Sequence, residues 1–185
     1  MCIRDCANAV WPRVVGDERC NNNIFFDIGA NVGIYSIYYA SIYGSKVYSF
    51  EPSFRNLDLL VRNINLNNLR DNISVISNPV FDKKILNYFT QTQNIAGDAG
   101  ATFSKKTLFK NNFKTLSITL DYLVKENIVK KPNLIKIDVD GNEIEVLNGA
   151  KKIISSQDCF SILVETRTST KDIIAGVLTE CGYSL

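Results

Sequence analysis

Short apolar runs alternate with longer amphipathic segments along this chain of 185 residues. The apolar runs are typical of buried strands, which we predict at 24–28, 46–50, 73–76, 134–138 and 160–164. Apolar residues at helical spacing predict the intervening helices at 32–43, 53–64, 119–128, 144–154 and 169–180. The polar segment 82–114 has weak periodicity and is expected to form strands and a mobile loop.

This alternation predicts an α/β fold with a doubly wound, mostly parallel sheet and helices on both faces, because parallel strands require helical crossovers. In such sheets, ligands bind beyond the carboxyl ends of the strands, where the strand order reverses. Four acidic residues fall at predicted strand carboxyl ends: Asp27, Glu51, Asp138 and Glu165. We therefore expect a crevice lined with carboxylates.

Composition favours one compact domain, predicted at 23–185 after an N-terminal extension at 1–22. The net charge is +2 and the lysines are scattered or paired, so a nucleic-acid surface is not indicated. No run reaches the roughly 18 apolar residues of a membrane span, and we expect no membrane partner and a cytoplasmic protein.

The cysteines and the missing histidines limit the chemistry of the chain. Five cysteines occur without any Cys-x-x-Cys pair, which argues against a disulfide framework or a zinc ribbon. The chain contains no histidine, so acid or base chemistry must come from carboxylates, lysine or tyrosine.

A glycine turn follows the first predicted strand, with Gly29 and Gly33 in a G-x-x-x-G spacing. Gly29 would permit the tight turn and Gly33 close packing, but one glycine of a dinucleotide fingerprint is missing. A turn that needs no pyrophosphate, preceded by Asp27 and followed 24 residues later by Glu51, suits a cationic ligand with a ribose, such as S-adenosylmethionine (SAM). Alternatively, the glycines serve only the turn and Glu51 only the dipole of the next helix.

Several motifs together resemble the FkbM family of SAM-dependent methyltransferases, and the resemblance runs from about Asn23 to Tyr183. They are 27–33 (DIGANVG), 50–52 (FEP), 119–121 (TLD), 134–143 (LIKIDVDGNE) and 146–150 (VLNGA). The stretch around Asp138 is the more specific, since many methyltransferases share the first motif. Asp140 is a conservative departure at the acidic position before the glycine.

The resemblance implies a Rossmann-like class I methyltransferase fold and O-methylation of a hydroxyl on a sugar or small metabolite. By position, it assigns the methionine part of SAM to Asp27, Gly29, Asn31 and Gly33. It assigns the ribose to Glu51, while Asn78 and Val80 would approach the adenine.

For the chemistry on the acceptor, Asp138 is the first choice as general base, with Asp140 and Glu165 as further catalytic candidates. Some O-methyltransferases use a divalent metal, and these three carboxylates are plausible ligands, but the spacing leaves the metal unassigned. Helix capping by Asp138 or Asp140, and pairing of Glu165 with Arg167, are the structural alternatives.

The segment 91–106, which contains Asn94, Asp98, Ala99 and Thr102, is either the acceptor-side loop or an exposed excursion. Two other functions stay open. One is a non-catalytic or degenerate SAM-binding module. The other is a nucleic-acid amino-methyltransferase, since 77–81 (SNPVF) partly resembles the N-P-P-[YF] element.

The methyltransferase fold usually adds two further strands beyond the point where this sequence stops. We therefore expect a fold that lacks those two strands and exposes the strand at 160–164. An exposed edge of this kind favours pairing between copies, so we expect either a homo-oligomer through the sheet edge or a naturally or artificially shortened chain.

Overall fold

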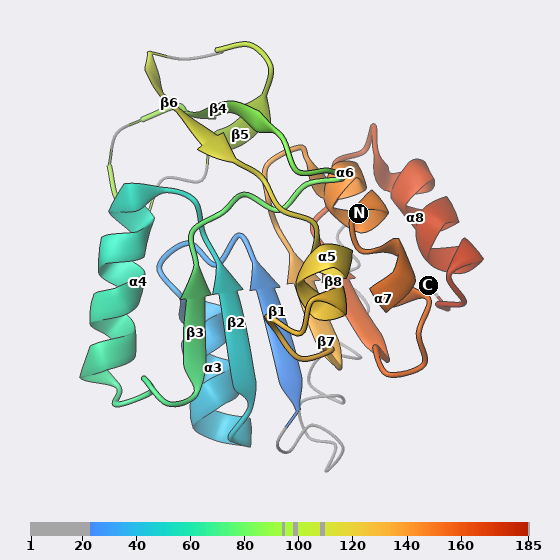
Figure 1. The fold of residues 1–185 in the computed structure, drawn as a ribbon, viewed down its shortest axis with the longest axis horizontal. Helices are drawn as coiled ribbons and strands as arrows, with labels where there is room; N and C mark the ends of the chain where they lie inside the picture. Colours follow the sequence, from blue (N-terminus) through green and yellow to red (C-terminus); the bar gives the residue numbers. More distant parts are fainter. Residues whose placement is uncertain (1–22, 94, 98–99, 108–109, 185) are drawn as a thin grey trace.

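The computed structural model describes residues 23–93, 95–97, 100–107 and 110–184 (Figure 1). The expected extension at 1–22 lies outside the described residues, as do Asn94, Asp98 and Ala99 of the expected acceptor-side loop.

Five parallel strands form the central sheet in the order β3-β2-β1-β7-β8. They are β1 (Ile24–Ile28), β2 (Lys46–Phe50), β3 (Ile73–Ile76), β7 (Leu134–Ile137) and β8 (Ser161–Val164). The strand order reverses between β1 and β7, which places a crevice for ligands at their carboxyl ends. The predicted doubly wound α/β fold is confirmed, and β3 and β8 are the outer strands of this sheet as described.

Helices cover both faces of the sheet (Figure 1). They are α3 (Ile34–Tyr43), α4 (Phe54–Leu66), α5 (Leu120–Lys125), α6 (Glu143–Asn148), α7 (Lys151–Ile154) and α8 (Lys171–Glu180). Successive residues of β1 point to opposite faces: Phe25 joins the core beneath α3 and α4, and Phe26 joins the core beneath the other four helices. None of the helices in the described part of the chain has the length and apolar character needed to span a bilayer.

The helix predicted at 144–154 is in fact two short helices, α6 and α7, which are separated at Gly149 and Ala150. The segment that follows β3 packs against this break, since a β-carbon on Gly149 would lie 2.1 Å from the carbonyl oxygen of Phe81. The helix predicted at 119–128 ends earlier, at Lys125.

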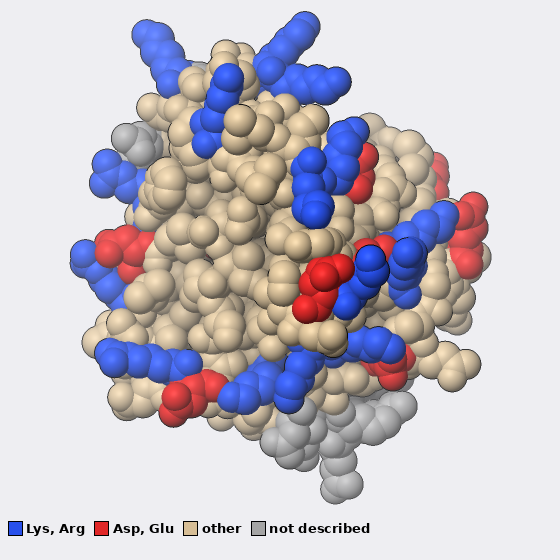
Figure 2. Space-filling view, in the orientation of Figure 1, with Lys and Arg blue, Asp and Glu red and all other residues tan. Residues whose placement is uncertain are grey.

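The polar segment after β3 forms a second, antiparallel sheet with the strand order β5-β4-β6. Its strands are β4 (Leu86–Gln91), β5 (Ala101–Ser104) and β6 (Asn111–Leu116). Strands were predicted here, but not their pairing. This sheet lies above the carboxyl ends of the parallel strands (Figure 1), and we call it the roof. Figure 2 shows basic side chains standing apart at the roof, whereas acidic and basic side chains mix lower on this face.

Candidate functional site

A pocket lies between the carboxyl ends of the parallel strands and the roof. It encloses about 710 Å³ including its open mouth. Strand ends and following loops supply one wall, and β4 and β5 supply the other. The lining includes Gly29, Asn31, Glu51, Asn56, Asn78, Val80, Phe89, Thr102, Phe103, Asp138, Asp140 and Asn142.

The glycine turn after β1 is shaped by close contacts. Gly29 has a φ of 78°, and a β-carbon on it would lie 1.8 Å from the carbonyl oxygen of Asp138. Gly33 has a φ of 89°, and its β-carbon would lie 2.3 Å from a methyl carbon of Leu60. Gly29 lines the pocket, whereas Gly33 serves helix packing and does not line it.

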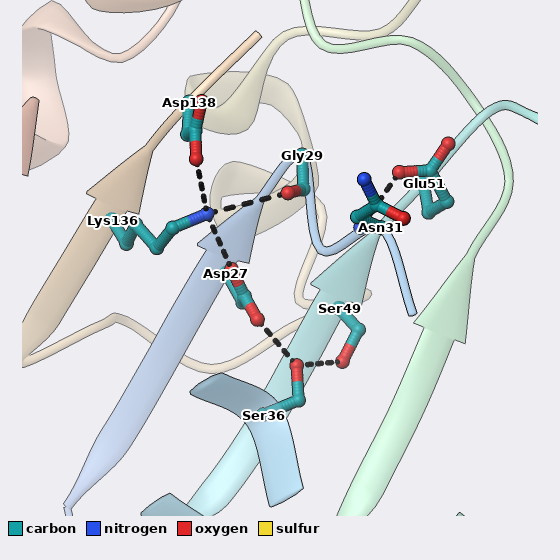
Figure 3. Close-up of polar contacts among 8 residues, drawn as sticks. All are labelled: Asp27, Gly29, Asn31, Ser36, Ser49, Glu51, Lys136 and Asp138. Atoms are coloured by element: carbon teal, nitrogen blue, oxygen red, sulfur yellow. Dashed lines mark hydrogen bonds and ion pairs between the residues drawn. The ribbon is translucent and has the colours of Figure 1, made fainter. Parts of the chain in front are cut away.

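Asp27 lies beneath the glycine turn and does not line the pocket. Its side chain is fully buried and accepts a hydrogen bond from the Ser36 hydroxyl at 2.6 Å. Its other oxygen lies 3.3 Å from the ammonium of Lys136. Figure 3 shows this arrangement, in which Ser36 also contacts Ser49. In this structure, Asp27 supports the turn from below.

Glu51 follows β2 and faces the pocket with only 5% of its surface exposed. One carboxylate oxygen accepts the backbone N–H of Asn31 at 2.8 Å, and the other accepts that of Ser53 at 2.8 Å. Asn56 donates a further, longer hydrogen bond at 3.5 Å. Burial raises the pKa of Glu51 above its ordinary value, although these hydrogen bonds act to lower it.

Asn31 is in the left-handed region with a φ of 51° and lines the pocket beside Glu51. Its side-chain oxygen is buried and has no hydrogen-bond partner among the described residues. A buried acceptor of this kind normally has a partner, so it is available to a donor on a ligand.

Asn78 and Val80 line the pocket beyond β3, on the side where the adenine was expected. The Asn78 amide nitrogen donates to the carbonyl of Leu116 at 2.9 Å. Val80 is buried and supplies an apolar surface.

Asp138 and Asp140 line the opposite side of the pocket, beyond β7. Burial acts to raise the pKa of Asp138, but a hydrogen bond from Glu165 and the charge of Lys136 outweigh it and lower the pKa. Glu165 is exposed and does not line the pocket, so it reaches the site through Asp138. Burial raises the pKa of Asp140, whose carboxylate accepts the Ala101 N–H of the roof at 3.4 Å.

The metal alternative finds no support in this arrangement. No group of three or more His, Cys, Asp or Glu side chains within the described residues is placed to hold a metal ion. Asp138 and Asp140 share the pocket, but Glu165 lies outside its lining.

The sequence interpretation missed three polar residues of the site. Lys136 is 5% exposed, and its ammonium contacts Asp27 and Asp138. A lysine inside the apolar strand Leu134–Ile137 was the available signal. The Asn56 side-chain oxygen accepts the Gly97 N–H at 2.8 Å, and that of Asn142 accepts the Phe103 N–H at 3.0 Å. Asn56 and Asn142 therefore hold the roof side of the pocket. No local sequence pattern indicates this role.

Two other parts of the recognised motifs are structural. The Asp121 carboxylate accepts the backbone N–H groups of Lys152 and Ile153, each at 3.1 Å, and so caps α7. Glu143 accepts the Gly141 N–H at 2.8 Å and holds the turn after Asp140.

The profile of the Methyltransferase FkbM domain matches residues 27–185. The chain belongs to the FkbM methyltransferase family.

Relatives of this FkbM domain include the hexuronic acid methyltransferase AglP of Haloferax volcanii, which is 26% identical over 166 residues. The match covers 87% of this chain and 64% of AglP, so the chain spans less than two thirds of that protein.

Solved structures show the same methyltransferase fold. The methyltransferase FkbM of Methylobacillus flagellatus KT has a TM-score of 0.60 at 20% identity, covering 85% of this chain and 37% of that one. The precorrin-6y C5,15-methyltransferase of Geobacter metallireducens GS-15 has a TM-score of 0.55 at 12% identity. The match covers 89% of this chain and 65% of that one.

Proposed function

We propose that this FkbM domain is a SAM-dependent methyltransferase that methylates a hydroxyl group of a sugar or small metabolite, with an acidic sugar as the favoured acceptor. One observation carries the proposal: a single pocket presents Glu51 and the glycine turn on one side and Asp138 on the other. The matched family and the hexuronic acid methyltransferase relative support it.

The residues present suit SAM. The unpartnered Asn31 side-chain oxygen is a fitting acceptor for the ammonium of the methionine part, and Gly29 offers backbone without a side chain. The Glu51 carboxylate is held by Asn31 and Ser53 in a fixed orientation toward the pocket, where it can accept ribose hydroxyl protons. When bound, SAM supplies an activated methyl group on a sulfonium, so the protein mainly positions the two reactants.

On the acceptor side, Asp138 is the residue best suited to orient a hydroxyl and take its proton. Its side chain is 40% exposed, and its lowered pKa keeps it ionised at neutral pH. Lys136 has a raised pKa and stays protonated, so it is no candidate for the base. Asp140 is engaged with the backbone of the roof.

The charge of the roof favours an anionic acceptor. The segment 83–118 contains six lysines and a single acidic residue, Asp98. A surface of mostly one sign attracts ligands of the opposite sign and raises their local concentration. The carboxylate of a hexuronic acid is such a ligand.

The test is to measure binding of SAM by calorimetry and then transfer of label from methyl-labelled SAM. The acceptors are glucuronic acid oligosaccharides and matched neutral glucose oligosaccharides. We expect binding, and transfer that favours the acidic sugar. Absence of SAM binding would overturn the central proposal, and equal transfer to both sugars would overturn the acidic preference. Binding without transfer to any hydroxylated acceptor would indicate the non-catalytic module instead.

A further inference from the structure

Lys136 lies where the two halves of the pocket meet beneath its floor. It belongs to β7, the strand that pairs with β1 at the reversal of strand order. Its ammonium lies 3.3 Å from an Asp27 oxygen and 3.2 Å from an Asp138 oxygen. It also donates to the carbonyl of Gly29 at 3.3 Å. Figure 3 shows these three contacts converging on one nitrogen atom.

Two of the three contacts are ion pairs, with Asp27 and Asp138, and the contact with the Gly29 carbonyl is a hydrogen bond. The Asp27 carboxylate is below the glycine turn, the Gly29 carbonyl is in the turn itself, and the Asp138 carboxylate is at the acceptor side of the pocket. The ring of Tyr35 lies over the same ammonium, with its centroid at 5.1 Å. A buried ammonium with this many partners has little freedom to move.

We propose that Lys136 is a positioning residue that fixes the Gly29 carbonyl and the Asp138 carboxylate relative to one another. The cofactor turn and the acceptor-side carboxylate thereby depend on a single cation. This inference rests on the proposed function, since it assigns those two groups to the cofactor and the acceptor.

The charges around the site agree with this role. Burial alone would lower the pKa of Lys136, but Asp27 and Asp138 outweigh it and raise the pKa, so the ammonium persists. The charged side chains that act on Asp138 or its neighbour Asp140 are Lys136, Glu165, Arg167 and Glu143. Of the two cations, only Lys136 contacts Asp138 in an ion pair.

Removing Lys136 alone would leave Asp27 as a buried charge without its cation and would destabilise the fold. The variants are therefore built on Asp27→Asn, which serves as the reference. Lys136→Met in that background removes both the charge and the hydrogen bond to Gly29. Lys136→Gln in the same background removes the charge but keeps an amide that can donate to the Gly29 carbonyl.

The first measurement is a titration of the Asp138 carboxyl by carbon-13 NMR, with the signal assigned through Asp138→Asn. We expect the pKa of Asp138 to rise by about one unit or more in both double variants relative to Asp27→Asn. An unchanged pKa in either double variant would overturn the proposal. This titration requires no SAM, so failure of the wild type to bind SAM would count against the proposed function alone.

The second measurement is calorimetry with SAM. We expect the Met variant to bind about tenfold more weakly than the reference and the Gln variant to stay within about threefold of it. Equal affinities in the two double variants would overturn the positioning of Gly29. In the wild type, nitrogen-15 NMR of labelled lysine should show Lys136 protonated at about pH 9, and a neutral amine there would overturn the proposal even if no variant folds.

Discussion

The backbone of Asp138 occupies the space that a side chain on Gly29 would need. A β-carbon on Gly29 would lie 1.8 Å from the Asp138 carbonyl oxygen, so the end of β7 and the turn after β1 are in direct contact. Backbone contact therefore fixes the distance between the cofactor side and the acceptor side of the proposed active site.

Replacement of Gly29 by alanine should therefore destabilise the fold strongly. We expect a loss of about 3 to 5 kcal/mol in the free energy of unfolding, from the clash and from the positive φ together. Chemical denaturation measures it. Gly182→Ala is the matched control, because Gly182 has a φ of 90° but open space around its β-carbon position. The free energy of unfolding of that variant should fall by only about 1 to 2 kcal/mol. Equal losses in the two variants would contradict the close contact between Gly29 and the Asp138 backbone.

Glu51 predicts a pH dependence of SAM binding. Because burial raises its pKa, Glu51 becomes protonated at a higher pH than an exposed glutamate does. We expect affinity for SAM to fall as the pH drops from about 7.5 to about 5, the region just above an ordinary glutamate pKa. In Glu51→Gln, binding should be at least about 100-fold weaker and this dependence should disappear.

Calorimetry across this pH range tests the dependence, with Glu126→Gln as an exposed control that should behave as wild type. The raised pKa also means that Glu51 favours the folded state most below its ordinary pKa. That contribution is lost as the pH rises through the folded-state value. A pH-independent affinity in the wild type would count against Glu51 as the ribose ligand.

Asp121 should matter for stability and not for ligand binding. Its carboxylate caps α7 through two backbone N–H groups, so Asp121→Ala should lower the free energy of unfolding by about 1 to 2 kcal/mol. Affinity for SAM should stay unchanged. Asp172→Ala is the control, since Asp172 lies in the first turn of α8 without a capping bond and should change stability by less than about 0.5 kcal/mol. A loss of SAM binding in Asp121→Ala would refute the structural assignment.

Asn142 should control the dynamics of the roof. Its side-chain oxygen accepts from the Phe103 N–H and from the Thr102 hydroxyl, at 3.0 and 3.2 Å. In Asn142→Ala, we expect amide hydrogen exchange in β5 to become about tenfold faster, because the strand loses its tie to the acceptor side. Mass spectrometry measures this change. Asn148→Ala removes an exposed side chain from the end of α6 and should leave β5 unchanged.

The parallel sheet could be predicted from local patterns because each of its strands is a short apolar run. The first three predicted strands have the bounds that the structure shows, and the last two differ by one residue. Glu51, Asn78 and Asp138 could be placed at one edge, because parallel strands bring their carboxyl ends together. Local pattern and general topology were sufficient there.

The remaining features depend on contacts between distant segments. The break between α6 and α7 follows from Phe81, which lies 68 residues before Gly149 in the sequence. The roof reaches the site through Gln91, whose side-chain amide donates to the Ser53 hydroxyl at 2.8 Å. Asp27 was expected to line the crevice because it falls at a predicted strand carboxyl end, but its side chain contacts Ser36 and Lys136.

The two ends of the segment that carries the roof are joined to each other. Val80 and Ile118 form a parallel bridge, and Phe81 and Ile118 are joined by a backbone hydrogen bond at 2.9 Å. The stretch between them, which carries the roof, therefore begins and ends at neighbouring points. Between these ends, the roof contacts the floor through Gln91, which donates to Ser53, and through the Gly97 N–H, which donates to Asn56. A change of side chain in the roof would therefore be felt at the cofactor side of the pocket through these two contacts.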